Sequence, residues 1–188
     1  GHETGPRSQE TAAVVSHLDS LFGDLISKLE QLPISKNMNI IAVADHGMAE
    51  ISSERTVDLS AYTDMSQIIQ EGSGPYAFLY SKKKNIIEPA VNQLKKAEHI
   101  SVYLKSDIPD RYPFKNHHRI KDALIVADEG WYIQNQAISS SSTAGEYVPT
   151  GGTHGYDNQL KSMHALFIAQ GPAFKKDIVT EPFENVNI

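Results

Sequence analysis

The chain has 188 residues, of which 40% are hydrophobic and 21% are charged, and its net charge is −6 with an isoelectric point of about 5.7. This is the composition of an ordinary globular protein long enough for one sizeable core, which excludes a fibre or a disordered tail. The acidic balance excludes a surface that coats nucleic acid, because binding to the phosphate backbone needs an excess of Lys and Arg.

The sequence shows no membrane span, no signal segment and no cysteine. No stretch approaches the ~20 apolar residues that a membrane span needs, and the start shows no basic-then-apolar signal segment. The chain begins with Gly1 rather than methionine, so these absences leave targeting open. The lack of cysteine excludes disulfides and thiolate zinc sites, and it leaves the cellular compartment open as well.

The first predicted element is an amphipathic helix over residues 8–32. Apolar residues recur there at spacings of three and four, which places them on one helix face. Ser8 is the expected N-cap, and Pro33 ends the pattern. The residues of the apolar face are Val14, Val15, Leu18, Leu21, Phe22, Leu25, Ile26, Leu29 and Leu32.

The rest of the chain alternates between predicted strands and one helix. A buried strand is expected over 39–44 and a final strand over 163–169, both from continuous apolar runs. Between them we expect strands over 75–80, 99–104, 123–127 and 131–133, a helix over 86–97, and a mobile loop at the serine run 139–142. We therefore divide the chain into core residues 1–81, a small α+β insert over 82–148, and a return to the core over 149–188.

Three histidines stand beside glycines just outside these segments. Asp45 and His46 close the strand 39–44 at its carboxyl end, where open α/β sheets bind ligands, and Gly47 lets the chain turn. His154 follows two glycines in a loop, and His2 lies in the opening Gly-His-Glu-Thr-Gly-Pro. Three imidazoles and a carboxylate suit zinc, although four ligands are too few for two catalytic zinc ions.

The order of these motifs carries a resemblance. Gly-His-x-x-Gly-Pro, Ala-Asp-His-Gly-Met and Thr-His-Gly-x-Asp-Asn, in that order, resemble the later half of the nucleotide pyrophosphatase/phosphodiesterase (type I phosphodiesterase) family, within the alkaline phosphatase superfamily. The likeness extends along most of the chain, to the segments 119–131 and 171–186. The resemblance implies an α/β fold that is part of an alkaline-phosphatase-like sandwich, with a mostly parallel sheet and the small α+β insert.

The resemblance also implies a two-zinc site. In such enzymes the histidines matching His2 and His154 bind one zinc, together with an aspartate four residues before the first, and the pair matching Asp45 and His46 binds the other. That aspartate, the second metal's other aspartate and the threonine or serine nucleophile would all precede Gly1. We therefore expect no catalytic nucleophile in this chain, two Zn²⁺ ions in the intact enzyme, partial or no zinc in the isolated chain, and no turnover by it.

The resemblance implies a hydrolase of phosphodiester or nucleotide pyrophosphate bonds acting on a small nucleotide or phosphodiester. Two alternatives stay open: another superfamily hydrolase, acting on phosphonates or phosphomonoesters, and a non-catalytic fragment or binding module.

Other motif residues have ordinary interpretations. We expect packing for Met48, loop fixation for Asp157 and Asn158, no nucleophilic role for Thr153, structural roles for His17 and His164, an exposed loop for His117, His118 and Arg119, and a solvated turn for Lys82, Lys83 and Lys84.

Overall fold

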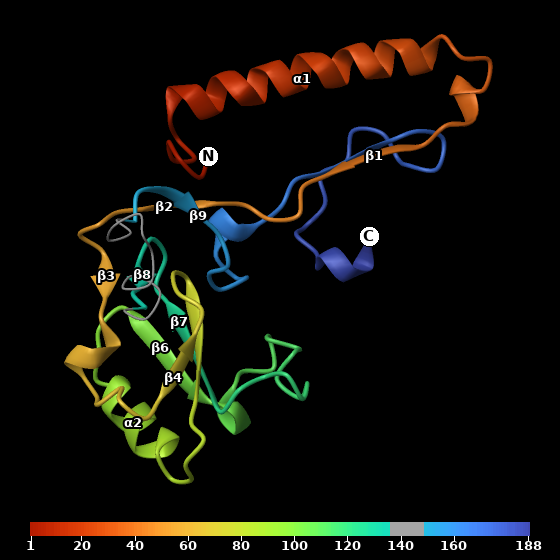
Figure 1. Cartoon of the computed structure of the whole chain (residues 1–188). Helices are drawn as coiled ribbons and strands as arrows, with labels where there is room; N and C mark the ends of the chain where they lie inside the picture. The colour runs from red at the N-terminus through yellow and green to blue at the C-terminus, as the bar shows by residue number, and fades with distance from the viewer. Residues whose placement is uncertain (136–148) are drawn as a thin grey trace.

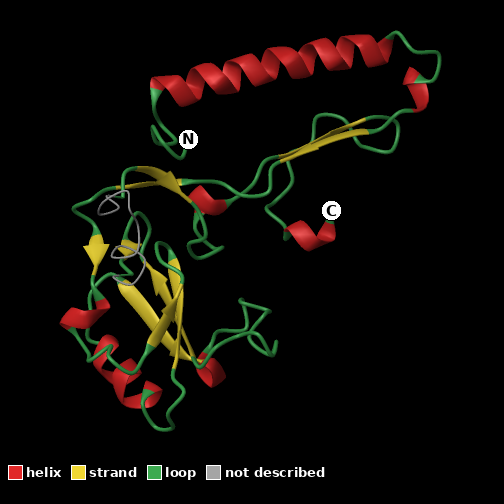
Figure 2. Ribbon diagram, viewed as in Figure 1, coloured by secondary structure: helices red, strands yellow, loops and turns green. Residues whose placement is uncertain are grey.

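The computed structural model describes residues 1–135 and 149–188, so the serine run 139–142 lies outside the described residues. It is a mixed α/β structure in which one long helix stands apart from a packed four-stranded sheet (Figure 1). Short two-stranded pairs join the two regions, and the ribbon coloured by secondary structure shows the long loops between them (Figure 2).

The long helix α1 covers Gln9–Glu30 and confirms the predicted helix. Ser8 is its N-cap, since the hydroxyl accepts a hydrogen bond from the backbone N–H of Thr11 at 3.1 Å. The apolar spacing holds, but no residue of α1 is buried, and Leu18 and Leu21 are more than half exposed. Neither α1 nor another helix of the described residues combines the length and apolarity that crossing a membrane requires.

Strand β1, Ile40–Val43, pairs antiparallel with β10, Phe167–Gln170. Both strands were predicted, but the expectation that the first is buried is wrong, because Ile41 and Val43 are about half exposed. The pair forms a ribbon with no described third strand, so the alternate side chains on one face have nothing to pack against. The ribbon runs below α1 in the view of Figure 1.

The packed region is an antiparallel sheet in the order β4-β5-β7-β6. Its centre is β7, all five residues of which are buried, and α2 buries Ile87, Ala90, Val91 and Leu94 against the same core. These elements confirm the helix expected at 86–97 and the strands expected at 75–80, 99–104 and 123–127. Their bounds are β4 Ile69–Glu71, β5 Tyr76–Tyr80, α2 Ile87–Leu94, β6 Ile100–Leu104 and β7 Ala123–Ala127.

Two small strand pairs complete the described structure. β2, Ala49–Ile51, pairs antiparallel with β9, Gly151–Thr153, and β3, Thr56–Val57, pairs parallel with β8, Tyr132–Ile133, the strand predicted at 131–133. Single 3₁₀ turns occur at Ser35–Asn37, Leu59–Ala61, Lys105–Asp107, Lys161–Met163 and Asn185–Asn187.

The topology bears on two expectations from the sequence, the mostly parallel sheet and the boundary at residue 82. Among the described strands, parallel pairing is limited to β3 and β8, whereas a mostly parallel sheet was expected. The strands that flank His46 and His154 pair in antiparallel fashion, β1 with β10 and β2 with β9. The boundary expected at residue 82 falls between β5 and β6, which flank β7 in one sheet, so this sheet draws strands from both sides of it.

Candidate functional site

The structure brings the three motif histidines together from distant parts of the chain. His46 follows β1, His154 follows β9, and His2 lies in a turn closed by a hydrogen bond from the Gly5 N–H to the Gly1 carbonyl at 2.9 Å. The rings of His46 and His154 stack with centroids 3.5 Å apart, and the ring of His2 lies 5.3 Å from that of His154. The three histidines thus meet at the ends of two separate antiparallel strand pairs.

Two glycines allow His2 to reach the other histidines. The N–H of Gly152 donates to the His2 carbonyl at 3.0 Å, so the opening turn lies directly against β9. A Cβ on Gly151 would lie 2.1 Å from the His2 carbonyl oxygen, and one on Gly152 would lie 2.7 Å from the sulfur of Met48. The pair of glycines before His154 is therefore required for this close backbone approach, and Met48 has the packing role expected of it.

Backbone carbonyls fix the protonation pattern of two imidazoles. Nδ1 of His2 donates to the Gly152 carbonyl at 3.0 Å, and Nδ1 of His46 donates to the Gly47 carbonyl at 2.8 Å. Because a carbonyl oxygen only accepts hydrogen bonds, each Nδ1 carries the proton, and the neutral ring keeps a lone pair on Nε2. Histidines that bind metals have this arrangement, with one nitrogen donating to the protein and the other free for the ion.

The carboxylate of Asp45 lies beside Nε2 of His46. Its Oδ2 is 3.3 Å from Nε2 of His46, while Oδ1 accepts from the His46 backbone N–H at 3.0 Å. The Asp45 side chain is 85% exposed, so a ligand can reach it from solvent. An exposed carboxylate beside an imidazole nitrogen supplies the oxygen and nitrogen donor types that borderline cations accept.

Neighbouring groups also keep His154 neutral. Burial lowers the pKa of His154, and the positive charge that His46 and His2 would carry lowers it further, with Asp45 acting in the opposite direction. Three imidazoles this close cannot all be protonated without strong mutual repulsion. The lowered pKa of His154 therefore favours its neutral form, which is the form of imidazole that binds metals.

The donor set fits zinc in chemistry but not in arrangement. His2, His46, His154 and Asp45 supply the nitrogen and oxygen donors that zinc accepts. Within residues 1–135 and 149–188, however, no group of three or more His, Cys, Asp or Glu side chains has the arrangement of a metal-binding set. Face-to-face stacking of His46 and His154 accounts for this, because stacked rings do not direct their nitrogens at a common point.

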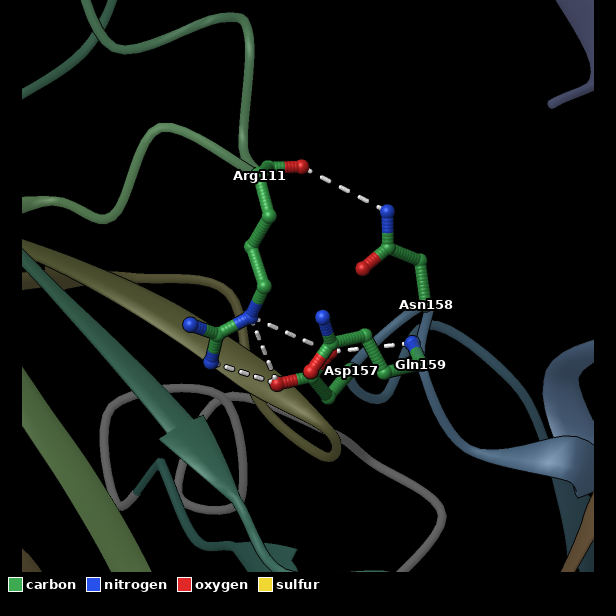
Figure 3. Close-up of polar contacts among 4 residues, drawn as sticks. All are labelled: Arg111, Asp157, Asn158 and Gln159. Carbon is green, nitrogen blue, oxygen red and sulfur yellow. Dashed lines mark hydrogen bonds and ion pairs between the residues drawn. The ribbon is translucent and has the colours of Figure 1, made fainter.

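An ion pair that the sequence did not predict holds the loop after His154 (Figure 3). Two guanidinium nitrogens of Arg111 donate to the carboxylate of Asp157, at 2.6 Å from Nη2 and 3.1 Å from Nε. Asp157 also accepts from the Gln159 N–H at 3.0 Å, which confirms its expected loop-fixing role, and the Asn158 amide donates to the Arg111 carbonyl at 3.4 Å. No local motif marks Arg111, because its partner lies 46 residues away.

The imidazoles of His17, His117, His118 and His164 and the lysine run are exposed. His17 is exposed on α1, and His164 is exposed just before β10. His117 and His118 are exposed and contact each other, as expected of a loop, with ring centroids 4.3 Å apart. Lys82, Lys83 and Lys84 are exposed between β5 and α2, as expected of a solvated turn.

A cavity of about 450 Å³ opens beside the His154 loop. Aromatic side chains form much of its wall, with Tyr76 and Phe78 from β5 and Tyr112 and Phe114 from the loop that carries Arg111. Gly155 borders it, but the four candidate metal ligands do not line it. The cavity is thus a neighbour of the histidine cluster rather than part of it.

A family model and several curated proteins match this chain. The family model described as type I phosphodiesterase/nucleotide pyrophosphatase matches residues 1–157. Human bis(5'-adenosyl)-triphosphatase ENPP4 is 38% identical over 178 residues, which cover 94% of this chain and 37% of that protein. Human ectonucleotide pyrophosphatase/phosphodiesterase family member 5 is 33% identical, and its match covers 100% of this chain and 38% of that protein.

Solved structures of one of these relatives also align with this chain. Murine ectonucleotide pyrophosphatase/phosphodiesterase 5 aligns with a TM-score of 0.79 at 35% identity, covering 94% of this chain and 45% of that one. An inactive variant of the same murine protein, in complex with AMP, aligns with a TM-score of 0.78 at 34% identity. The chain spans less than half the length of the relatives it matches.

Proposed function

The chain belongs to the type I phosphodiesterase/nucleotide pyrophosphatase family, and we propose that the protein containing it is a zinc-dependent hydrolase of phosphodiester or nucleotide pyrophosphate bonds. The observation that carries the proposal is the gathering of His2, His46 and His154 from three distant segments, with Asp45 beside them. The relatives' names support the reaction class, and the AMP complex of the murine relative supports a nucleotide as ligand.

Each candidate ligand has a proposed place. His2 and His154 would hold one zinc ion, and Asp45 and His46 the other. When bound, the two ions would supply Lewis-acid activation of the nucleophile and of water, together with stabilisation of charge on the phosphoryl oxygens. Further aspartates and the threonine or serine nucleophile would lie outside residues 1–188 in this proposal. The parallel strands of an alkaline-phosphatase-like sheet would likewise come from outside these residues.

The chain's own contacts prepare the donors for this task. Donation from Nδ1 to the Gly152 and Gly47 carbonyls holds His2 and His46 with Nε2 available. The lowered pKa of His154 keeps that ring neutral at physiological pH, so no proton must be displaced before it binds a cation. Asp45 supplies negative charge where two dications would otherwise repel each other.

The proposal is tested in the full-length protein that carries residues 1–188. His154→Ala and Asp45→Ala should each reduce bound zinc or hydrolysis of nitrophenyl thymidine phosphate by at least tens-fold, because each removes a direct ligand. His117→Ala is the matched control, since it removes an exposed imidazole outside the cluster.

Zinc content and release of nitrophenol measure the two effects. Faster hydrolysis of nitrophenyl phosphate than of the thymidine diester would favour a phosphomonoesterase instead. Equal effects of the three substitutions would contradict the assignment of ligands.

A further inference from the structure

The cavity beside the His154 loop lies on the face of the packed sheet that α2 does not cover. Alternate residues of β7 belong to two separate cores: Ile125 packs in the core shared with α2, whereas Leu124 and Val126 pack with Tyr112 from the loop that follows β6. Leu124, Val126 and Tyr112 also line the cavity, so the loop covers this face without filling it. The volume of about 450 Å³ is typical of small-molecule sites, which span roughly 300–1,000 Å³.

Two pairs of aromatic rings line this cavity. The rings of Tyr112 and Phe114 stack with centroids 5.8 Å apart, and the rings of Tyr76 and Phe78 in β5 meet edge to face at 5.9 Å. Tyr112 is buried, but Tyr76 is 45% exposed and Phe114 is 39% exposed. A planar apolar ligand in the cavity can therefore stack on ring surface that is otherwise in contact with water.

The charges around the cavity favour an uncharged ligand. Among the described residues that line it, Arg111 alone is charged, and two of its nitrogens donate to Asp157 at 2.6 and 3.1 Å. Burial alone would raise the pKa of Asp157, but hydrogen bonds from Arg111 and the Gln159 N–H outweigh it and lower the pKa. The pair is therefore ionised at neutral pH and neutralises itself, so that a phosphate would meet no unpaired cation in the lining.

Asn158 supplies a polar group to the same lining. Its amide nitrogen donates to the Arg111 carbonyl at 3.4 Å, whereas its carbonyl oxygen Oδ1 accepts no hydrogen bond from residues 1–135 or 149–188. The side chain is exposed and lines the cavity, so a ligand can reach Oδ1. Because a carbonyl oxygen only accepts hydrogen bonds, the matching group on the ligand is a donor, such as the amino group of an aromatic ring.

We propose that this cavity is a nucleoside site, which binds an uncharged planar base that carries an amino group, with adenine as the test case. The base would stack on the ring of Phe114 and donate from its amino group to Oδ1 of Asn158. A volume of about 450 Å³ admits a purine together with its ribose. The four candidate metal ligands do not line the cavity, so this site needs neither a metal nor a phosphate and goes beyond the proposed hydrolase.

The test is binding of the fluorescent nucleoside aminopurine riboside to the full-length protein in the presence of a metal chelator. This probe carries an amino group and no phosphate, and stacking on an aromatic ring quenches its emission. We expect saturable quenching that adenosine reverses by competition. AMP should compete no better than adenosine, because its phosphate meets no unpaired cation.

Two phenylalanines of equal exposure provide a matched pair of variants. Phe114→Ala should raise the dissociation constant of the probe about fivefold or more, which is the smaller end of the cost of losing a stacked base. Phe22→Ala, on α1, should leave it unchanged, because Phe22 is 38% exposed, as Phe114 is 39%, but does not line the cavity.

Asn158→Ala tests the contact to the amino group. The unsubstituted protein should bind adenosine about threefold more tightly than purine riboside, which has no amino group, as expected for one hydrogen bond. Asn158→Ala should bind the two nucleosides equally, which a general loosening of the loop would not produce. Emission of Trp131, the single tryptophan, and the melting temperature should show that each variant is folded.

Quenching that weakens in Phe114→Ala and persists in Phe22→Ala would support the site. Absence of quenching, unchanged affinity in folded Phe114→Ala, or retained preference for adenosine in Asn158→Ala would overturn it. Much tighter competition by AMP than by adenosine would also overturn it, since the probe would then occupy a site that holds phosphate. None of these results changes the proposed hydrolase, which zinc content and turnover test separately.

Discussion

Helices α1 and α2 are both amphipathic in sequence, but α1 is exposed to solvent and α2 is packed against the sheet. Both have apolar residues at helical spacing. α2 buries four of its eight residues against the four-stranded sheet, whereas α1 buries none of its 22. The difference shows that amphipathic spacing specifies a face, and that a second surface is needed before the face contributes to stability.

The histidine cluster lies at the junction of these two regions. His46 belongs to the weakly packed side, where it follows β1, whose alternate residues are exposed. Through Tyr156 and Asp157, His154 is tied to the packed side, by contacts to Trp131 and Arg111. The candidate site thus joins one rigid support and one that has few buried contacts.

The sharpest way to test this contrast is hydrogen exchange along the chain. The amide of Ile125, at the centre of β7, should exchange only on global unfolding, which costs roughly 5–15 kcal/mol in ordinary domains. The amide of Leu21 in α1 should exchange at least ~100-fold faster, because a helix with no buried face is marginal in water. Mass spectrometry of peptides from both segments measures the difference, and equal protection would show that α1 is packed after all.

Much of the fold is readable from local pattern. The ends of α1, including its cap at Ser8, and the strands β1, β5, β6, β7 and β10 follow from apolar periodicity and capping residues. Burial does not follow, because it depends on partners far away in sequence. This is why β1 was expected to be buried although Ile41 and Val43 are about half exposed.

A matched pair of leucine substitutions tests the same contrast energetically. Leu79 in β5 is fully buried and Leu18 in α1 is 58% exposed. Leu79→Ala should lower the free energy of unfolding by about 2–5 kcal/mol, since it removes transfer energy and leaves a cavity. Leu18→Ala should change it by no more than ~0.5 kcal/mol. Urea unfolding measures both, and a large cost at Leu18 would mean that its face is covered in solution.

The sequence predicts the histidines of the candidate site but not the ion pair that holds the loop after His154. Each of His2, His46 and His154 stands beside glycine, which is a local signal, and the gathering of the three follows from motif order in a known family. The ion pair between Arg111 and Asp157 has no such signal, because only the folded chain brings residues 46 positions apart into contact. The Asp157 carboxylate was assigned to local backbone hydrogen bonds, and that accounts for only one of its contacts.

Alkaline pH should weaken the packed side selectively. Burial, followed by interaction with the Asp157 carboxylate, raises the pKa of Tyr112 to about 12, and burial also raises the pKa of Tyr156. Both tyrosines stay neutral in the folded state at pH values where the unfolded chain, with tyrosine pKa values near 10, releases its protons. Their contribution is therefore fully present below pH ~10 and is lost as the pH rises toward the folded-state values.

The expected loss is at most ~1.4 kcal/mol per pH unit for each tyrosine, which is less than the cost expected for Leu79→Ala. Helix α1 contains no tyrosine, so tyrosinate absorbance does not report on α1. Tyr112→Phe should flatten the decline in the urea midpoint between pH 10 and 12, because phenylalanine keeps the ring but has no proton to lose. An unchanged decline in this variant would show that Tyr112 titrates normally and that its hydroxyl is not held in a buried environment.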